Sequence, residues 1–434
     1  MRRRPEAPAR SPLPPFEQGG TEGGFPRLRR AAVLACLVAV LSTACQPPHP
    51  SDPTTPEPTP ARTDFRNPQS CVEDFDPAAD YFPAKAAPRF AERFAVEYYP
   101  HYKLVTVTLP DGRSFRYLLL QCGTPRPAGY GDAEFVQIPV RTVVTTSTAE
   151  LPHLVTLDLV DRLVGHDDPD YVSSPEVRRR IAAGQVREVG RETRLNLEIL
   201  LAVDPELVLM STLGGFESGS DARLRQAGVA VAYVPSYLET TPLGTAEWIL
   251  FTACFFNRED AAAGPFSEVA ERYQELAALG RTARERPTVF TGAPIGDVWH
   301  VPGGESFMAH LVEDAGGRYL WDDQPVAGSV PLAIESVYER AENADFWLHP
   351  GLWGSLDALA AADERFTALA AFGQRRVYAN DARMNEVGVQ GVGGNDYWET
   401  GIARPDVVLA DLLRIFHPEL VPGHELVYHR RLDE

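Results

Sequence analysis

Short runs rich in valine and leucine alternate with helix-like segments in two separate regions of this chain. Strands that alternate with helices are typical of βαβ units, in which a mostly parallel sheet is covered on both faces. Between the two regions, residues 266–277 place apolar side chains three and four positions apart, which predicts one long amphipathic helix. We therefore expect an α/β protein of two Rossmann-like lobes joined by a single long helix.

This alternation divides the 434 residues into consecutive parts, and a chain of that length is too long for one ordinary domain. A leader and a tether come first, and a strand-rich extension precedes the first lobe. The predicted boundaries are 1–44 for the leader, 45–70 for the tether, 71–136 for the extension, 137–257 for the N-lobe, 258–286 for the linking helix and 287–434 for the C-lobe.

The periodicity also predicts the individual elements of each lobe. In the N-lobe we expect strands at 140–145, 162–164, 206–210 and 229–234, with helices at 149–159, 195–203, 221–227 and 243–256. In the C-lobe we expect strands at 288–291, 345–349 and 376–379, with helices at 306–314, 334–341, 355–371 and 406–416.

The leader has the features of an export signal. Arg27, Arg29 and Arg30 precede an apolar run at 31–41, and small residues follow that run before Cys45. A basic start, a short apolar core and a small-residue cleavage site are typical of a secretory signal. The apolar run is too short to span a bilayer, which needs about 20 residues.

The small residues before Cys45 resemble a bacterial lipobox, in which the cysteine is diacylated and becomes the first residue of the mature protein. Ser42 stands where that motif usually has leucine, and cleavage by an ordinary signal peptidase is the alternative. Residues 46–70 hold eight prolines, which is typical of a semi-extended tether. We therefore expect an exported protein that is lipid-anchored at the cell envelope.

The five cysteines have different expected roles. Cys36 lies in the leader, Cys45 is the lipidation candidate, and Cys254 lies in an apolar run that predicts a buried thiol. Cys71 and Cys122 flank a segment with strand-like alternation, and export would allow these two to pair. Two free thiols are the alternative.

Composition and motifs argue against several function classes. The net charge of −19 disfavours nucleic acid, which needs a basic surface. The chain has no Gly-x-Ser-x-Gly motif, and the glycines at 388–394 lack nucleotide-loop spacing. No Cys or His pair has metal-ligand spacing, and His417, His424 and His429 lie in a terminal segment that we expect to be solvated. We expect no metal site and no enzyme, although an exported α/β enzyme or a sensory lipoprotein is the alternative.

Two segments share one layout. Residues 195–198 end in Glu198 and lead into the strand at 206–210, and residues 331–335 end in Glu335 and lead into the strand at 345–349. With this layout, the chain resembles the iron-siderophore, haem and vitamin B12 class of solute-binding proteins of ABC importers over roughly residues 140–420. Segments 239–248 and 393–406 resemble a bacterial subgroup of that class.

The resemblance implies a function and partners. The chain is expected to deliver a metal chelate to an ABC permease and its ATPase subunits as a monomer without a resident cofactor. A ferric siderophore is the first expectation, and vitamin B12 or haem is the alternative. Glu198 and Glu335 are expected to pair with permease arginines, which bind carboxylates in bidentate fashion. The alternative is that each glutamate only caps its own helix.

A ligand crevice is expected where the carboxyl ends of the strands meet between the lobes. Helix starts with serine and glycine would offer amide donors, and aromatic rings would offer flat apolar walls, although core packing is the alternative for each ring. The candidates on the N-lobe are Thr146, Ser147, Tyr171 and the segment from Ser211 to Gly215. On the C-lobe they are Trp299, Gly303, Gly304, Ser306, Trp353, Arg383, Asn385, Tyr397 and Trp398.

Overall fold

The computed structural model describes residues 66–191, 194–211, 219–385 and 393–433. The leader, Cys45 and nearly all of the tether lie outside these residues, as does the segment 212–215 of the predicted crevice. Among the described residues, no helix combines the length and the apolar character that a membrane span requires.

The N-lobe is built on a parallel five-stranded sheet in the order β11-β10-β5-β6-β7. Its strands β5, β10 and β11 are fully buried and consist mainly of valine, leucine and alanine, as expected for a sheet covered on both faces. The strands are β5 (Val143–Thr145), β6 (Leu163–His166), β7 (Arg187–Glu188), β10 (Leu207–Met210) and β11 (Ala230–Tyr233). The helices are α1 (Leu151–Thr156), α2 (Pro175–Ala182), α3 (Leu197–Ala202), α4 (Ser220–Gln226), α5 (Pro242–Ala246) and α6 (Trp248–Phe256).

The C-lobe repeats this plan with the sheet order β15-β12-β17-β18-β19, in which only β19 runs antiparallel to its neighbour. A small antiparallel sheet, β13-β14-β16, adds to it. The strands are β12 (Thr288–Thr291), β13 (Pro294–Ile295), β14 (Val298–Pro302), β15 (Arg318–Tyr319), β16 (Ser329–Ala333), β17 (Phe346–Leu348), β18 (Val377–Ala379) and β19 (Arg430–Arg431). The helices are α8 (Phe307–Asp314), α9 (Ile334–Ala341), α10 (Leu356–Ala362), α11 (Ala370–Gly373), α12 (Thr400–Ala403) and α13 (Pro405–Phe416).

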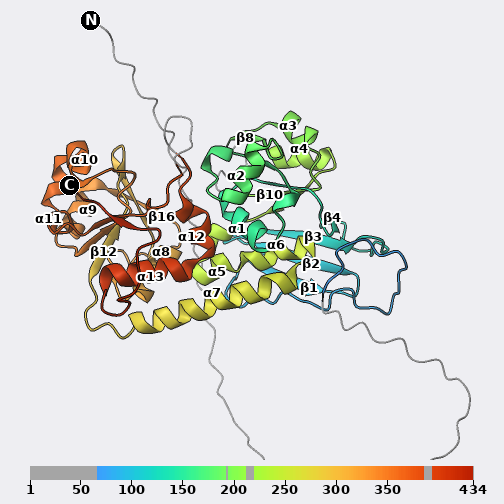
Figure 1. Cartoon of the computed structure of the whole chain (residues 1–434), viewed down its shortest axis with the longest axis horizontal. Coiled ribbons are helices and arrows are strands. Elements are labelled where there is room, and N and C mark those ends of the chain that lie inside the picture. Colours follow the sequence, from blue (N-terminus) through green and yellow to red (C-terminus); the bar gives the residue numbers. More distant parts are fainter. Residues whose placement is uncertain (1–65, 192–193, 212–218, 386–392, 434) are drawn as a thin grey trace, which may run out of the picture. The chain divides into compact units, whose positions relative to one another are not determined.

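One helix, α7 (Glu259–Gly280), joins the two lobes (Figure 1). Its buried positions include Phe266, Ala270, Tyr273 and Ala277, spaced three and four apart, and the helix packs against α6 and α13. It ends six residues before the predicted boundary. Gly280 is required there, because a Cβ atom on it would lie 2.0 Å from the Asp314 carbonyl oxygen. The predicted architecture of two α/β lobes on one long helix is confirmed.

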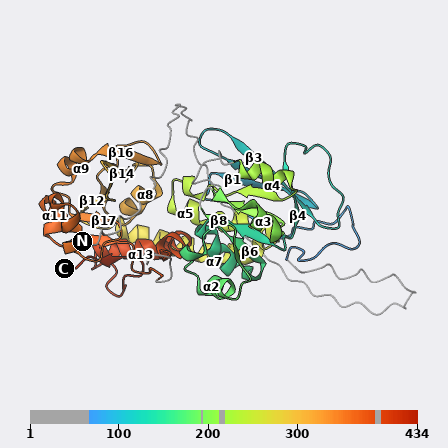
Figure 2. The same ribbon diagram turned by 90° about the horizontal axis from the view of Figure 1, so that it is seen from above.

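The extension forms a separate four-stranded sheet that packs on the N-lobe, where β4 contacts β11 (Figure 2). The structure joins Cys71 and Cys122 in a disulfide, which is the pairing considered from the sequence, and Cys254 is a buried thiol. The strands are β1 (Phe94–Tyr98), β2 (Tyr102–Thr108), β3 (Ser114–Gln121) and β4 (Glu134–Ile138).

Two buried glutamates hold the segment that leads into this sheet. Glu247 accepts the backbone amides of residues 89–91 at 2.6–2.9 Å, and Glu239 accepts those of residues 92–93 at 3.0 Å. Glu239 also accepts a 3.0 Å bond from the Trp248 indole. The segment 239–248 therefore anchors the extension to the N-lobe, a role that its sequence did not reveal.

Two predictions for the C-lobe were wrong. The helix expected at 355–371 stops at Ala362, because Asp363 is extended (φ −154°) and caps a new short turn with its own side chain. The terminal segment is not solvated: β19 pairs with β18, and His417 and His429 are buried. Long-range pairing of this kind leaves no periodic signal in the sequence.

Candidate functional site

At the carboxyl ends of β5 and β10, three of the predicted residues come together. The Thr146 hydroxyl accepts a 2.8 Å bond from the backbone amide of Ser211. Ser147 caps the following turn by accepting the Ala149 amide at 3.1 Å. These contacts fix the loops that form the N-lobe edge of the predicted crevice.

Loops of the two lobes touch directly at the strand ends. The Asn385 amide donates to the carbonyl oxygens of Asp170 at 3.3 Å and Val172 at 2.6 Å. Beside this contact a Cβ atom on Gly394 would lie 1.7 Å from the Tyr171 carbonyl oxygen, so only glycine fits. The structure therefore brings Tyr171 and Asn385, predicted on opposite lobes, to one interlobe contact.

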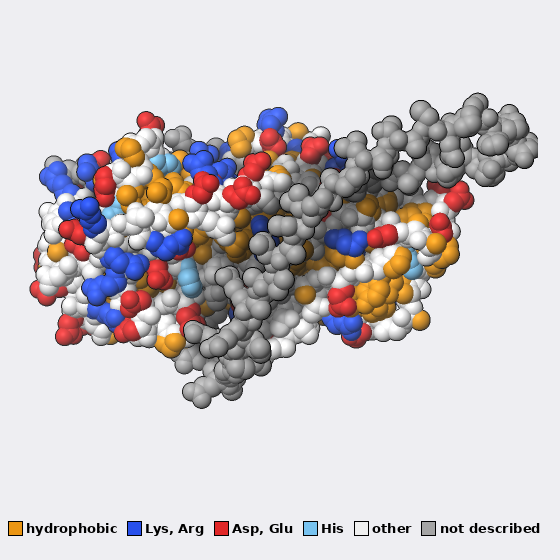
Figure 3. All heavy atoms as spheres, turned by 90° about the horizontal axis from the view of Figure 1, so that it is seen from below, with side chains coloured by type: hydrophobic (Ala, Val, Ile, Leu, Met, Phe, Trp, Pro, Cys, Tyr) orange, Lys and Arg blue, Asp and Glu red, His pale blue; other side chains and the backbone are white. Residues whose placement is uncertain are grey.

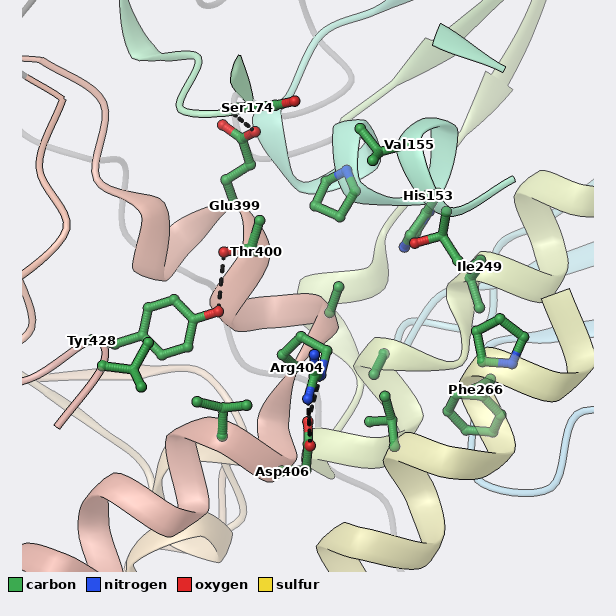
Figure 4. A pocket seen from close by; sticks show the side chains of 18 of the residues that line it. His153, Val155, Ser174, Ile249, Phe266, Glu399, Thr400, Arg404, Asp406 and Tyr428 are labelled. Atoms are coloured by element: carbon green, nitrogen blue, oxygen red, sulfur yellow. Dashed lines mark hydrogen bonds and ion pairs between the residues drawn. The ribbon is translucent and has the colours of Figure 1, made fainter. Parts of the chain in front are cut away.

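A buried carboxylate reinforces the contact. Glu399 is fully buried and accepts the backbone amides of Ser173 at 2.6 Å and Ser174 at 2.8 Å, at the start of α2 (Figure 4). Burial raises the pKa of Glu399 to about 7, and the two amide bonds oppose that rise. Glu399 was missed as a site residue, although it lies in the segment 393–406 that resembled a bacterial subgroup.

A cavity of about 830 Å³ lies beside this contact, bounded by α1, α2, α7, α12 and α13 (Figure 4). Its volume falls within the range of small-molecule sites, about 300–1,000 Å³. Apolar walls come from side chains such as Ile249 and Phe266, and Arg383 is the predicted site residue that lines it. Arg383 donates to Asp396 at 2.5 Å, so its guanidinium is held toward the C-lobe.

Several charged groups in this cavity are paired. The Arg404 guanidinium donates to both carboxylate oxygens of buried Asp406 at 2.8 and 2.9 Å, and Arg272 lies 3.6 Å from the same carboxylate. Burial lowers the pKa of His153 to about 4, which keeps its ring neutral, and Thr252 lies 3.0 Å from its Nδ1. The cavity thus offers apolar surface with a few oriented polar groups, an arrangement suited to an organic ligand.

Several predicted C-lobe residues are buried or tightly packed in the C-lobe. Trp299 is fully buried and donates its indole N–H to the Thr291 carbonyl at 3.0 Å. Cβ atoms on Gly303 and Gly304 would clash with backbone at 2.0 and 2.6 Å, and Ser306 is buried as the cap of α8. The sequence did not predict the pairing of β14 with β16, which holds Trp299 in this packed part of the C-lobe.

The remaining predicted aromatics differ in exposure. Tyr397 is buried between His349 and His429, so core packing describes it better than a ligand wall. Trp398 is 47% exposed, and Trp353 is half-buried with its indole N–H on the Pro350 carbonyl at 2.9 Å. Trp398 and Trp353 therefore remain candidates for ligand contact.

Glu198 and Glu335 are exposed in the first turns of α3 and α9. Asn196 caps α3 by accepting the Ile199 amide at 3.2 Å, and no side-chain bond caps α9. Neither glutamate therefore serves as the cap of its helix, and both carboxylates face solvent.

Acidification is expected to strengthen the contact that Glu399 makes between the lobes. Burial is the main cause of its raised pKa, Asp396 adds to it, and Arg178 opposes it. Because the pKa of Glu399 is raised when the lobes are in contact, the protonated carboxyl stabilises that contact. This stabilisation is fully present at a pH below the ordinary pKa of a glutamate, and it is lost as the pH rises through about 7. Protection factors of the Ser173 and Ser174 amides should be at least about tenfold higher near pH 5 than near pH 8. Glu399→Gln should remove this dependence, and an unchanged pH profile in that variant would contradict the assignment.

Comparisons with known proteins identify the same architecture. Residues 143–384, more than half of the chain, match the Periplasmic binding protein family. An uncharacterized lipoprotein of Methanocaldococcus jannaschii, MJ0878, is 25% identical over 338 residues, which cover 73% of this chain and 75% of that protein. A second lipoprotein of that organism, MJ0872, is 24% identical, over 79% of this chain and 86% of its own length.

Two solved structures share the fold. Helicobacter pylori CeuE in a Ni–His complex matches with a TM-score of 0.52 and 15% identity, over 74% of this chain and 91% of that one. A periplasmic heme binding protein from Pseudomonas aeruginosa matches with a TM-score of 0.50 and 17% identity, over 68% and 99%. Identities this low establish the fold alone. Together with the family match, two α/β lobes on one linking helix show that this chain belongs to the periplasmic binding protein family, the solute-binding proteins of ABC importers.

Proposed function

We propose that this protein binds a metal chelate between its lobes and delivers it to an ABC permease, with a ferric siderophore as the first candidate. The observation that carries this proposal is the interlobe site: loops at the carboxyl ends of both sheets meet through Asn385, beside a cavity of about 830 Å³. The family match supports the same proposal, because the members of that family bind solutes. The arrangement supports binding and delivery rather than catalysis.

The nature of the ligand rests on the chemistry of the cavity and of the exposed aromatic side chains. Arg383 lines the cavity and offers a cation for an anionic chelate. Trp398 and Trp353 lie outside the cavity lining and offer partly exposed aromatic faces for a macrocycle or for catechol rings. Haem is the alternative, because the structure from Pseudomonas aeruginosa is of a periplasmic heme binding protein. Vitamin B12 is equally compatible with such walls.

A titration against a panel of chelates tests the proposal. Exposed Trp398 should report binding through quenching of its fluorescence, and calorimetry should give one site per chain for at least one ferric siderophore, haem or corrinoid. Arg383→Ala should weaken binding of an anionic chelate by about tenfold, since a charge-assisted bond contributes about 1.5–3 kcal/mol. Arg365→Ala is the matched control, because Arg365 pairs with Asp363 on the C-lobe surface outside the cavity. Failure of every chelate to bind would refute the proposal.

We also propose that the mature protein starts at a lipid-modified Cys45, after a leader at 1–44, and stands off the membrane on the tether at 45–70. Related lipoproteins in Methanocaldococcus jannaschii support this placement. Acidic and basic side chains are interspersed on the face shown in Figure 3, which fits a protein that does not bind nucleic acid.

Fatty-acid labelling of growing cells is expected to tag the wild-type protein and to leave Cys45→Ser untagged. The reason is that the thioether-linked lipid requires the cysteine sulfur. Cys36→Ser, which changes the cysteine inside the leader, is the control and should keep the label. Equal labelling of Cys45→Ser and the wild type would show that Cys45 is not the anchor.

A further inference from the structure

A chain of hydrogen bonds runs through the C-lobe and ends at the carboxyl end of β17. His349 follows β17 directly, and its Nε2 lies 2.9 Å from Nε2 of His429. The ring planes differ by only 19° and the centroids are 5.1 Å apart, so the two imidazoles meet edge to edge. On its other side, Nδ1 of His429 lies 3.0 Å from Oδ2 of Asp411.

Asp411 fixes the direction of these bonds. Its fully buried carboxylate accepts the backbone amides of Val427, Tyr428 and His429 at 2.8–3.2 Å. Burial favours the neutral acid, but the hydrogen bonds from His429 and His424 hold the pKa of Asp411 below its ordinary value. An ionised carboxylate only accepts hydrogen bonds, so Nδ1 of His429 must be the donor.

The tautomer of His349 follows from that direction. With the pair uncharged, His429 has its proton on Nδ1, and its Nε2 accepts a bond from Nε2–H of His349. The remaining nitrogen of His349, Nδ1, then carries a free lone pair. It has no hydrogen-bond partner among the described residues and is not sealed from solvent, since His349 is only half-buried.

The position of His349 places its ring at the carboxyl-end edge of the C-lobe sheet, beside the loop that reaches the N-lobe. Carboxyl ends of parallel strands form the ligand crevice of open α/β sheets, and β17 is a central strand of the C-lobe sheet. The His349 ring packs against Tyr397 at 5.2 Å, and Tyr397 follows Asn395 and Gly394 in the loop that contacts Tyr171 of the N-lobe. His349 also adopts a left-handed backbone conformation (φ 53°), which is uncommon for a non-glycine residue.

We propose that Nδ1 of His349 coordinates the metal of the bound chelate, with His429 and Asp411 as positioning residues. A histidine that ligates a metal typically donates its other ring N–H to a fixed partner, which sets its tautomer and orientation. This inference rests on the proposed function and narrows the ligand. The solute is a chelate whose metal keeps at least one coordination position open, such as a porphyrin, a corrinoid or a tetradentate siderophore. A hexadentate siderophore, which saturates its iron, does not fit.

The test compares two probes on the full mature chain. Haemin has open axial positions, whereas the ferric complex of a hexadentate tris-hydroxamate has none. Haemin should bind with the optical and electron paramagnetic spectra of nitrogen-ligated ferric iron. His349→Asn should lose that spectrum and bind haemin at least about tenfold more weakly. Loss of a residue that only orients a metal ligand already weakens metal binding by about tenfold or more, so loss of the ligand itself should cost at least as much. Asparagine tolerates the left-handed conformation, so the backbone is kept.

Two further variants separate ligation from folding. His349→Gly fits the same backbone conformation and leaves room beside the metal, so added imidazole should restore the nitrogen-ligated spectrum. His300→Asn is the matched control, because His300 is a half-buried C-lobe histidine on β14 that lies 3.4 Å from the Ser329 hydroxyl and takes no part in the His349–His429–Asp411 chain. It should leave haemin binding unchanged, and thermal unfolding without ligand should show that each variant folds.

The outcomes are distinct. Spectral loss in His349→Asn with rescue of His349→Gly by imidazole supports ligation by His349. Haemin binding with the same spectrum and affinity in wild type and His349→Asn overturns this inference, and so does tight binding of the tris-hydroxamate complex alone, although both leave the proposed function intact. Binding of no metal chelate at all overturns both.

Discussion

Reversal of charge at Glu198 or Glu335 is expected to abolish uptake while solute affinity stays within about threefold of wild type, a change below about 1 kcal/mol. Both carboxylates are exposed at helix starts, and neither caps its helix or lines the interlobe cavity. If they meet permease arginines, an introduced arginine places like charges together, which costs several kcal/mol. Uptake by cells and calorimetric binding by purified protein measure the two effects separately.

The control for charge reversal lies on the linking helix. Glu271→Arg makes the same change at an exposed helical position of α7, away from the starts of α3 and α9, and should leave uptake near wild type. Loss of solute binding together with uptake in Glu198→Arg would show a structural role for that glutamate. Normal uptake in both variants would refute the docking assignment.

The second large effect concerns a buried ion pair between the extension and the linking helix. Lys103 on β2 and Glu259 at the start of α7 are both fully buried and bonded to each other. Lys103 also donates to the Cys254 carbonyl at 2.9 Å and to the Asn257 side chain at 2.8 Å. Lys103→Met should lower the free energy of unfolding by about 3–5 kcal/mol, because it leaves the Glu259 carboxylate buried without its cation.

The chain contains a matched control for this change. Its other lysine, Lys85, pairs with Asp80 at 2.8 Å where both side chains are about half exposed. Lys85→Met should therefore change stability by no more than about 1 kcal/mol. Urea unfolding monitored by circular dichroism gives both values. Equal losses in the two variants would mean that the buried pair does not secure the junction of α6 and α7.

Periodicity predicted most of the lobe architecture, because buried strands and amphipathic helices leave repeating patterns in the sequence. Strand β12 and helix α9 have the predicted bounds. The end of the helix before Asp363 was not predicted. The Asp363 side chain accepts a backbone amide of the next turn in place of a helical hydrogen bond, and the spacing of apolar residues does not reveal such a bond. The burial of Lys103 was equally hidden, since it depends on partners more than 150 residues away.

The site was less predictable than the fold. Residues at strand ends, such as Thr146 and Asn385, follow from topology, and the structure places them in the loops at the lobe edges. The burial of Trp299 and Tyr397 could not be predicted, because composition alone does not distinguish an aromatic side chain of the core from one that lines a ligand site. Glu399 and His349 were missed, because their roles arise from contacts across the lobes or with the chain terminus.

The most direct test of the account is the identity of the solute that the protein carries when it is isolated without denaturation from its own cells. Extracted material should be analysed for metal by emission spectroscopy and for the organic ligand by mass spectrometry. The account predicts one metal-bearing chelate per folded chain, released when the protein is unfolded and taken up again by the empty protein. A solute without metal, such as a sugar or an amino acid, bound at the same stoichiometry would contradict it.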